Sequence, residues 1–404
     1  MSDNLSIPNV DHPIGPLVSV GILGVLSLTA PTLSCARDGA RRIVGQSENS
    51  LRATPPRRAR RRRHPGPRRR LLGERERSTV EISITEAATL GARSLERLGY
   101  STSESRTVVD HLIDCELRGL AYSGLARVLS IADRLSTRPR GHERSEVVRD
   151  SPVAATIDAH DELGYLAAPL AASLVREKAF SNGIAAVAVR DTWYTGMLSY
   201  YAEPLADAGL VVMAVSNASP WVAVSGGSDP LVGTNPICIA VPTADRPIVW
   251  DIGTSAITHA DTVLAGREGR SLPGGVAFGP DGAPTTDPAS ALAGALAPWG
   301  GHRGSGLAMA VQLLGMHAGS AALPSELSGF GMSIVAMRSD LFADEGHLER
   351  EASAFSDAVR TSRPLDPSAP VRLPFGRSRA LRTDRRRRGT IDVSDAVLDA
   401  VAAL

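Results

Sequence analysis

The sequence predicts an α/β fold, and three features of the chain indicate it. Apolar residues recur at helical spacing in the region that follows residue 84. From residue 151 on, short β-branched runs bounded by glycine and proline alternate with helical segments. The chain also lacks a Gly-x-Gly-x-x-Gly turn directly after a strand, which argues against a Rossmann-type dinucleotide-binding unit.

Composition and charge exclude several classes of protein. The 404 residues carry a net charge of +1, so the whole chain is neither a polyanion binder nor an acidic protein. The three cysteines lie far apart without a Cys-x-x-Cys pair, which argues against a disulfide framework and a metal site and favours a reducing, cytoplasmic setting. The apolar segment 14–36 has no basic start and contains prolines, so we expect neither export nor a membrane span.

Residues 1–79 differ from the rest of the chain. Nine arginines fall between Arg57 and Arg70. Such a run cannot form a core, and we expect residues 1–79 to be a disordered, arginine-rich extension. Nucleic acid is the alternative partner for this tract, but the simpler prediction is an unstructured segment without one.

Helices are predicted first. Thr85 is the predicted N-cap of a helix that Gly99 ends. Ser101, with Glu104 three residues later, predicts a capping box at the start of a second helix. Apolar residues at helical spacing over 125–131 predict a third.

Strands are predicted next, from apolar runs between glycine and proline, at 183–190, 209–217, 236–242 and 247–253. Helices are predicted at 166–181, 197–208, 304–318 and 348–363, with a strand at 333–338 and a final strand, turn and helix. These elements divide the chain into a helical part (80–150), a sheet domain (151–320) and a C-terminal α/β part (321–404) that returns to the first.

A glycine-rich turn at 298–306 carries two basic side chains at the start of a predicted helix. Gly301, Gly304 and Gly306 follow the pattern Gly-x-x-Gly-x-Gly, and His302 and Arg303 lie between them. A helix N-terminus offers free N–H groups, and glycine lets the backbone approach a phosphate closely. A tight helix entry with a solvated arginine is the equally favoured alternative.

Six stretches, taken in order, resemble one family. They are ELRGLAYSGLARV (116–128), LVGTNPICIAVP (231–242), WDIGTSA (250–256), GAPTTDP (282–288), WGGHRGSGLAM (299–309) and LPFGRS (373–378). From Ile84 to Leu404 the chain resembles the malate/L-lactate dehydrogenase family of NAD(P)-dependent oxidoreductases, and most closely its Δ1-pyrroline-2-carboxylate/Δ1-piperideine-2-carboxylate reductase branch. The resemblance implies a non-Rossmann α/β fold with a mostly antiparallel cofactor-binding sheet at 151–320, a helical and mixed second domain, and a homodimer.

The resemblance assigns substrate and proton roles to residues of four motifs. Arg127 matches the arginine that follows the family's Ser-His-Gly motif, and a guanidinium suits a carboxylate. Thr234 and Asn235 belong to a loop that lines the substrate pocket in relatives. The chain departs from the family where it has Tyr122 in place of serine and Ser123 in place of the proton-donating histidine. Asp261 falls where imine-reducing relatives have an aspartate, and His259 lies two residues earlier, next to the substrate.

Because serine is a poor general acid, three explanations stay open. The substrate is an imine that arrives protonated; or Tyr122, Tyr194 or a water held by Asp261 supplies the proton; or the site binds without turnover. For the cofactor, the resemblance implies NADP, with NAD possible, because Arg303 and Arg377 can receive a 2′-phosphate. The residues expected to bind it are Tyr194, Thr195, Gly196, Asp251, Thr254, Ser255, His302, Arg303, Gly304, Arg377 and Ser378.

The sequence therefore predicts an NAD(P)H-dependent reductase of a small cyclic 2-imino acid. The alternatives are a 2-hydroxy acid dehydrogenase of the malate or lactate type and a catalytically impaired NAD(P)-binding homologue. The expected partners are a small carboxylate substrate and a second copy of the chain.

Overall fold

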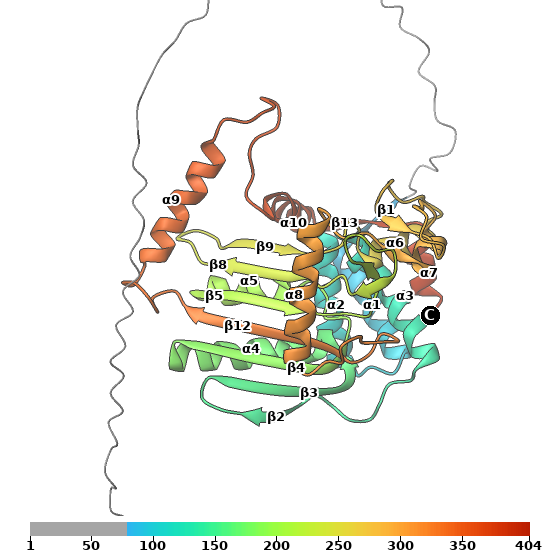
Figure 1. Cartoon of the computed structure of the whole chain (residues 1–404), viewed down its shortest axis with the longest axis horizontal. Coiled ribbons are helices and arrows are strands. Elements are labelled where there is room, and N and C mark those ends of the chain that lie inside the picture. Colours follow the sequence, from blue (N-terminus) through green and yellow to red (C-terminus); the bar gives the residue numbers. More distant parts are fainter. Residues whose placement is uncertain (1–78) are drawn as a thin grey trace, which may run out of the picture. The chain divides into compact units, whose positions relative to one another are not determined.

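Helices and strands alternate along residues 79–404, the part of the chain that the computed structural model describes (Figure 1). The helices are α1 (Ile84–Arg97), α2 (Thr102–Leu117), η1 (Ala121–Ser123, a 3-10 turn), α3 (Ala126–Thr137), α4 (Gly164–Asn182), α5 (Ser199–Asp207), α6 (His259–Arg267), α7 (Pro288–Ala293), α8 (His302–His317), α9 (His347–Thr361), α10 (Gly376–Arg388) and α11 (Asp395–Ala402). The predicted α/β class is confirmed. The expected extension over 1–79 lies outside the described residues, except for Thr79.

The strands are β1 (Thr79–Ser83), β2 (Glu146–Asp150), β3 (Ala154–Leu163), β4 (Ile184–Trp193), β5 (Leu210–Ser216), β6 (Val222–Ala223), β7 (Pro230–Val232), β8 (Ile237–Val241), β9 (Ile248–Ile252), β10 (Ala277–Phe278), β11 (Ala295–Leu296), β12 (Phe330–Arg338) and β13 (Thr390–Ser394). Sequence reasoning missed β3, which pairs with both β2 and β4. Its buried residues Ala155, Ile157 and Ala159 do alternate with polar ones, but two of the three are alanines, which gives only a weak strand signal.

Capping boxes start the first two helices. At α2, Ser101 Oγ accepts a hydrogen bond from Glu104 N and the Glu104 carboxylate accepts one from Ser101 N, as predicted. At α1 the predicted N-cap, Thr85, is wrong, because Ser83 and Glu86 form the box two residues earlier. The Ser83 hydroxyl accepts a hydrogen bond from the backbone N–H of Glu86, and the Glu86 carboxylate accepts one from the backbone N–H of Ser83.

One seven-stranded sheet forms the centre of the protein, in the order β2-β3-β4-β12-β5-β8-β9. Its β3–β4 pair is parallel, and the other neighbouring pairs are antiparallel. The strand β12, which follows α8 in the chain, lies between β4 and β5. The sheet therefore extends across residue 320, and the boundaries at 150 and 320 between the three predicted parts stay predictions.

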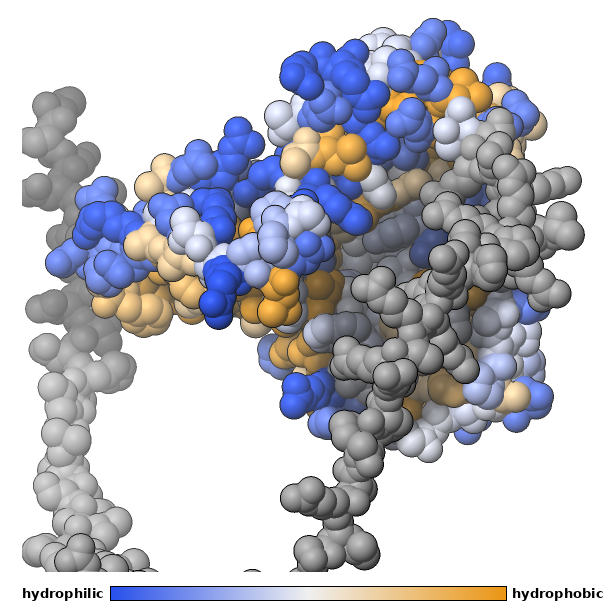
Figure 2. Space-filling model, turned by 90° about the horizontal axis from the view of Figure 1, so that it is seen from above, coloured by the Kyte–Doolittle hydropathy of each residue, from blue (hydrophilic) through white to orange (hydrophobic). Residues whose placement is uncertain are grey.

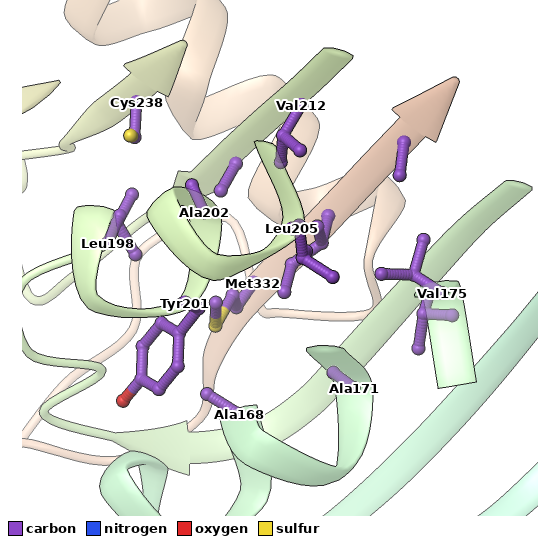
Figure 3. Packing of buried hydrophobic residues seen from close by; sticks show 14 of the residues in the cluster. Ala168, Ala171, Val175, Leu198, Tyr201, Ala202, Leu205, Val212, Cys238 and Met332 are labelled. Carbon is purple, nitrogen blue, oxygen red and sulfur yellow. The ribbon is translucent and has the colours of Figure 1, made fainter. Parts of the chain in front are cut away.

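Small side chains let two helices pack closely on one face of this sheet (Figure 3). Ala168, Ala171 and Val175 of α4 and Leu205 of α5 contact buried residues of the strands, such as Val212. Apolar burial of this kind contributes about 25 cal/mol per Å². On the other face, α8 packs Val311 against β5 and β8, and Figure 1 shows α8 crossing the strands there.

The C-terminal elements pack on the N-terminal helices. Strand β13 pairs antiparallel with β1, in register from Thr79 opposite Ser394 to Ser83 opposite Thr390. The buried side chains of α11, such as Val397 and Val401, join the core of α1, α2 and α3. The end of the chain therefore holds the helical part against which the functional site is built. In the described part of the chain, no helix combines the length and the apolar character that a bilayer crossing requires.

The central position of β12 can be tested by truncating a side chain. Ile334 is fully buried and lies opposite Val187 of β4 and Ala214 of β5. We expect Ile334→Ala to lower the free energy of unfolding by about 2–5 kcal/mol, because it leaves a cavity at the middle of the sheet. The control, Met213→Ala on the half-exposed side of β5, should cost less than about 1 kcal/mol. Urea unfolding measures both, and equal losses would contradict this packing.

Candidate functional site

A cavity of about 220 Å³ lies where the helical part meets the ends of several strands. The sides come from η1, α3, α6, the segment after β4, the segment before β8, and the strands β5 and β9. Of the residues predicted for the site, those that line this cavity are Tyr122, Ser123, Arg127, Tyr194, Thr195, Gly196, Thr234, Asp251 and His259. These residues, far apart in the sequence, share one cavity because the crossed sheet order brings their strands together.

Arg127 is the central charged group of the cavity. It lies in the first turn of α3 and only 7 % of it is exposed. Its guanidinium carbon lies 4.2 Å from the centre of the Tyr194 ring, and its Nε has no hydrogen-bond partner. Within the described part of the chain it forms no ion pair. A buried cation without a counter-charge is costly, so this position favours an anionic ligand.

A second arginine of α3, whose Nε also lacks a hydrogen-bond partner, shows a buried cation with a counter-charge in this protein. Arg134 also stacks on an aromatic ring, with its guanidinium 4.4 Å from the centre of Trp193. Unlike Arg127, it forms an ion pair with Asp161 and donates a hydrogen bond to the carbonyl of Arg138. The two arginines thus share a helix and an aromatic contact and differ in their counter-charge.

His259 is the histidine of the cavity. Its ring stacks on Trp221 with centroids 3.9 Å apart and an angle of 18° between the planes. Burial, with a smaller contribution from Arg127, lowers the pKa of His259 to about 3. The imidazole is therefore neutral near pH 7 and can donate one hydrogen bond, but it is not a charged acid.

The hydroxyl groups at the two positions that depart from the family pattern both line the cavity. Ser123 ends the η1 turn, and Tyr122 precedes it. Burial raises the pKa of Tyr122, so its hydroxyl stays protonated near neutral pH and is a hydrogen-bond donor. Neither residue supplies an ionised group.

Asp251 is the acidic group of the cavity. It lies on β9, and its carboxylate accepts a hydrogen bond of 2.7 Å from the backbone N–H of Ser199. Burial raises the pKa of Asp251, and the hydrogen bond from Ser199 opposes that rise. Arg127 and Asp251 are therefore the two ionisable groups of opposite sign that face the cavity.

Several predicted residues lie outside the cavity. Asn235 uses its amide within the protein, accepting from Ala218 N and donating to Ala308 O and Gln312 Oε1. Thr254 donates to Thr234 O. Asp261 lies on α6, 3.6 Å from Arg270. The polar groups of Asn235 and Thr254 are thus used within the protein. Asp261 does not line the cavity. Ser255 has a buried hydroxyl without a hydrogen-bond partner.

The remaining predicted residues begin two helices. His302, Arg303 and Gly304 start α8, and Arg377 and Ser378 start α10. Neither helix has a side-chain cap at its N-terminus. Among residues 79–404, Arg303 and Arg377 form no ion pair. Two helix N-termini, each beside an unpaired arginine, are suited to phosphate groups.

Gly304 has a further role that its motif did not reveal. A Cβ at Gly304 would lie 1.8 Å from the carbonyl oxygen of Trp299. This glycine is therefore required by the close packing of the turn on its own helix. The sequence left two explanations for these glycines, a phosphate-binding turn and a tight helix entry. The close contact at Gly304 is explained by the tight helix entry.

Sequence reasoning missed four aromatic residues of the cavity wall. Tyr165, Trp221 and Phe330 line the cavity without any motif that could have identified them, whereas Phe375 lies inside the LPFGRS stretch. Three non-glycine residues at or beside the cavity have left-handed backbone angles, namely Tyr194 (φ 47°), Asn235 (φ 33°) and Phe375 (φ 60°). Such strain is typical of functional sites. In the described part of the chain, no group of three or more histidine, cysteine or acidic side chains could hold a metal ion.

Comparisons with known proteins give consistent results. The family model for malate/L-lactate dehydrogenase matches residues 82–402. A Δ(1)-pyrroline-2-carboxylate reductase from Ancylobacter novellus is 35% identical over 58% of this chain and 70% of its own. A (2R)-3-sulfolactate dehydrogenase (NADP(+)) from Chromohalobacter salexigens is 33% identical over 80% of this chain and 97% of its own. The crystal structure of a dehydrogenase from Sinorhizobium meliloti aligns with TM-score 0.75 and 30% identity, covering 81% of this chain and 98% of that one.

The contrast between the two buried arginines can be tested by stability measurements. We expect Arg127→Met to leave the free energy of unfolding unchanged or to raise it by up to about 2 kcal/mol, because it removes a buried charge that lacks a counter-charge. The matched variant Arg134→Met removes the buried partner of Asp161, which keeps the half-exposed Arg138 and the Ser328 hydroxyl, and it should cost about 1–3 kcal/mol. Chemical denaturation of both variants decides, and a large loss for Arg127→Met would mean that its charge is already balanced.

Proposed function

The chain belongs to the malate/L-lactate dehydrogenase family and is an oxidoreductase, and we propose that it reduces a small cyclic 2-imino acid with a nicotinamide cofactor. The substrate class is that of Δ1-pyrroline-2-carboxylate and Δ1-piperideine-2-carboxylate. The Ancylobacter relative, named as a Δ(1)-pyrroline-2-carboxylate reductase, supports this choice.

The charge of the cavity is the observation that carries the proposal. Malate and sulfolactate each carry two anionic groups, and a site with two cations would suit them best. Arg127 is the cation that lines this cavity, and the other ionisable groups there are the acidic Asp251 and the neutral His259. A 2-imino acid has one carboxylate for Arg127 and, when protonated, a positive nitrogen that is compatible with a nearby carboxyl group.

The walls of the cavity support a ring as the rest of the substrate. Aromatic side chains surround the space, namely Tyr122, Tyr165, Tyr194, Trp221, Phe330 and Phe375. Flat apolar surfaces of this kind bind a five- or six-membered ring and exclude water. Tyr194 has a double use here, since its ring also lies against Arg127.

The protein's own part in the reaction is to bind, orient and shield the substrate. Arg127 holds the carboxylate, and the hydroxyls of Tyr122 and Ser123 and the N–H of neutral His259 are the available hydrogen-bond donors. When bound, the nicotinamide supplies the hydride. A protonated imine already carries the proton that a ketone would need from a general acid. This removes the need for the histidine that the family has where this chain has Ser123.

The cofactor residues fit a nicotinamide dinucleotide. Gly196 (φ 75°) and Thr195 line the cavity beside Tyr194, where a nicotinamide ring would lie. The uncapped starts of α8 and α10, with Arg303 and Arg377, are suited to phosphates. Two free guanidinium groups favour NADPH over NADH, and the Chromohalobacter relative is named as NADP(+)-dependent. NAD(H) is the alternative, because the same cations can hold a pyrophosphate.

A 2-hydroxy acid dehydrogenase is the second candidate. The Chromohalobacter relative, which matches a longer stretch of this chain than the Ancylobacter relative does, is named as a sulfolactate dehydrogenase. In that reaction a ketone oxygen must receive a proton, and the hydroxyl of Tyr122 is one of the donors in the cavity wall. A catalytically impaired NAD(P)-binding homologue is the remaining alternative, and turnover of either substrate excludes it.

We also propose a homodimer in the cytoplasm. Figure 2 shows apolar side chains on the surface of the molecule, and the exposed ones include Phe342, Phe355 and Leu365. Such exposure favours contact with a second copy. The described cysteines, Cys115 and Cys238, are free thiols, which favours a reducing compartment.

The choice between imine and ketone can be tested by steady-state kinetics. We expect kcat/KM with NADPH to be at least about 100-fold higher for cyclic 2-imino acids than for pyruvate or oxaloacetate, because general-acid help is missing for a ketone. Activity on the imine should fall as pH rises and the imine loses its proton. Equal or faster reduction of 2-oxo acids would reject the imine proposal.

Restoring the family's histidine provides a second test. Ser123→His should raise kcat/KM for 2-oxo acids by about tenfold or more and change imine reduction much less, since a general acid contributes to the ketone reaction alone. Ser123→Ala is the control and should leave imine reduction within about threefold of the wild type. A large loss in Ser123→Ala would show that the serine hydroxyl takes part in the proton transfer.

The phosphate site can be tested by nucleotide binding. We expect Arg303→Ala to weaken NADPH binding by about 1.5–3 kcal/mol, the usual range for a hydrogen bond to a charged group. Arg360→Ala is the matched control, since Arg360 is an exposed arginine of α9 paired with Asp357. Calorimetry with NADPH and NADH measures both variants. Unchanged affinity in Arg303→Ala would remove α8 from the cofactor site.

A further inference from the structure

We propose that Glu116 of α2 is a positioning residue, whose buried side chain fixes the start of α3 and thereby places Arg127 for the substrate carboxylate. The proposal rests on the proposed function in one respect, namely that Arg127 binds a carboxylate. Glu116 does not line the cavity. It acts through the helix that carries Arg127.

The first observation is a hydrogen bond between two helices. Glu116 Oε1 accepts from the backbone N–H of Leu125 over 2.8 Å. Leu125 is the N-cap residue of α3, and its own side chain cannot cap the helix. Glu116 therefore supplies from α2 the acceptor for the N-cap N–H that, in a capping box, a glutamate at N3 supplies from within the helix.

The second observation is that the neighbouring glycine makes room for this carboxyl group. A Cβ at Gly124 would lie 2.0 Å from Glu116 Oε1 and 2.3 Å from its carboxyl carbon. The backbone of Gly124 has φ −87° and ψ −140°, and that ψ lies outside the β and α regions that alanine prefers. The glycine is therefore required both by the close carboxyl group of Glu116 and by the backbone angles of the turn.

The third observation concerns what depends on this anchor. Arg127 follows Leu125 by two residues, and its N–H donates to Gly124 O over 2.9 Å. On the other side of Gly124 lie Tyr122 and Ser123, both in the cavity wall. Since the guanidinium of Arg127 has no ion pair in the described part of the chain, the backbone position of α3 decides where its charge lies.

The environment of Glu116 makes its glutamine variant a close substitute. Burial raises the pKa of Glu116 to about 7, while the Leu125 N–H and Arg385 act in the opposite direction. At neutral pH a large share of the side chain is therefore uncharged. Glutamine keeps the carbonyl acceptor in the same place, so it should preserve the cap.

The experiment measures the affinity of an unreactive ring carboxylate, cyclopentanecarboxylate, for the full chain. Relative to the wild type we expect Glu116→Ala to weaken binding by about tenfold or more and Glu116→Gln by less than about threefold. Gly124→Ala should weaken it about as much as Glu116→Ala. In the Glu116→Ala background, Gly124→Ala should weaken binding less than it does in the wild type, because its clash partner is gone and only the cost of the backbone angles remains.

Two further measurements separate positioning from general destabilisation. Hydrogen exchange of the Leu125 amide should accelerate in Glu116→Ala and not in Glu116→Gln. The control Ser83→Ala removes the cap of α1, far along the chain from the cavity residues, and should lower stability while leaving cyclopentanecarboxylate affinity unchanged. If Glu116→Ala does not fold, the cyclopentanecarboxylate affinities of Gly124→Ala and Glu116→Gln still test the proposal. Wild-type affinity in Gly124→Ala overturns it.

The outcomes distinguish the two proposals. If Arg127→Ala binds cyclopentanecarboxylate as tightly as the wild type, the proposed function fails at its carboxylate site. If Arg127→Ala loses binding while Glu116→Ala retains it, only the positioning role of Glu116 is overturned. The role is also overturned if the effects of Glu116→Ala and Gly124→Ala simply add.

Discussion

A buried cation without an internal counter-charge dominates the structure around the cavity. Arg127 lies inside the protein against the ring of Tyr194, and among residues 79–404 no carboxylate pairs with it. Such a group is unfavourable for stability and is typical of a site that gains its counter-charge from a ligand. Its surroundings include strained backbone at Tyr194 and a hydrogen bond from the start of its helix to Glu116 of α2.

The sheet order decides which residues meet at this charge. Strand β12 lies between β4 and β5, so the ends of β4, β5, β8 and β9 reach the same cavity as η1 and α3. The C-terminal β13 and α11 then hold the helical part in place through the core that includes Val397. The site is thus assembled from both ends of the described chain, which explains why its residues come in short, separated motifs.

The charges that line the cavity also bear on which class of substrate the site would bind. Members of one family can share a fold and a cofactor and differ in the charges that line the cavity. Here one guanidinium, one carboxyl group with a raised pKa and one neutral imidazole face a mainly aromatic space. That set is the basis of the proposal of a ring with a single carboxylate as the substrate.

The sequence alone determined the features that depend on neighbours in the chain. The α/β class, the Ser101–Glu104 capping box, the main strands and the family were predicted correctly, because periodicity, caps and motifs are local. Tertiary structure decided the rest. The sequence could not tell that Arg134 finds Asp161 while Arg127 finds no partner, that the amide of Asn235 is used by Ala308 and Gln312, or that Asp261 lies near Arg270. Burial and the choice of an ionic partner depend on segments far apart in the chain, and only the packed fold brings those segments together.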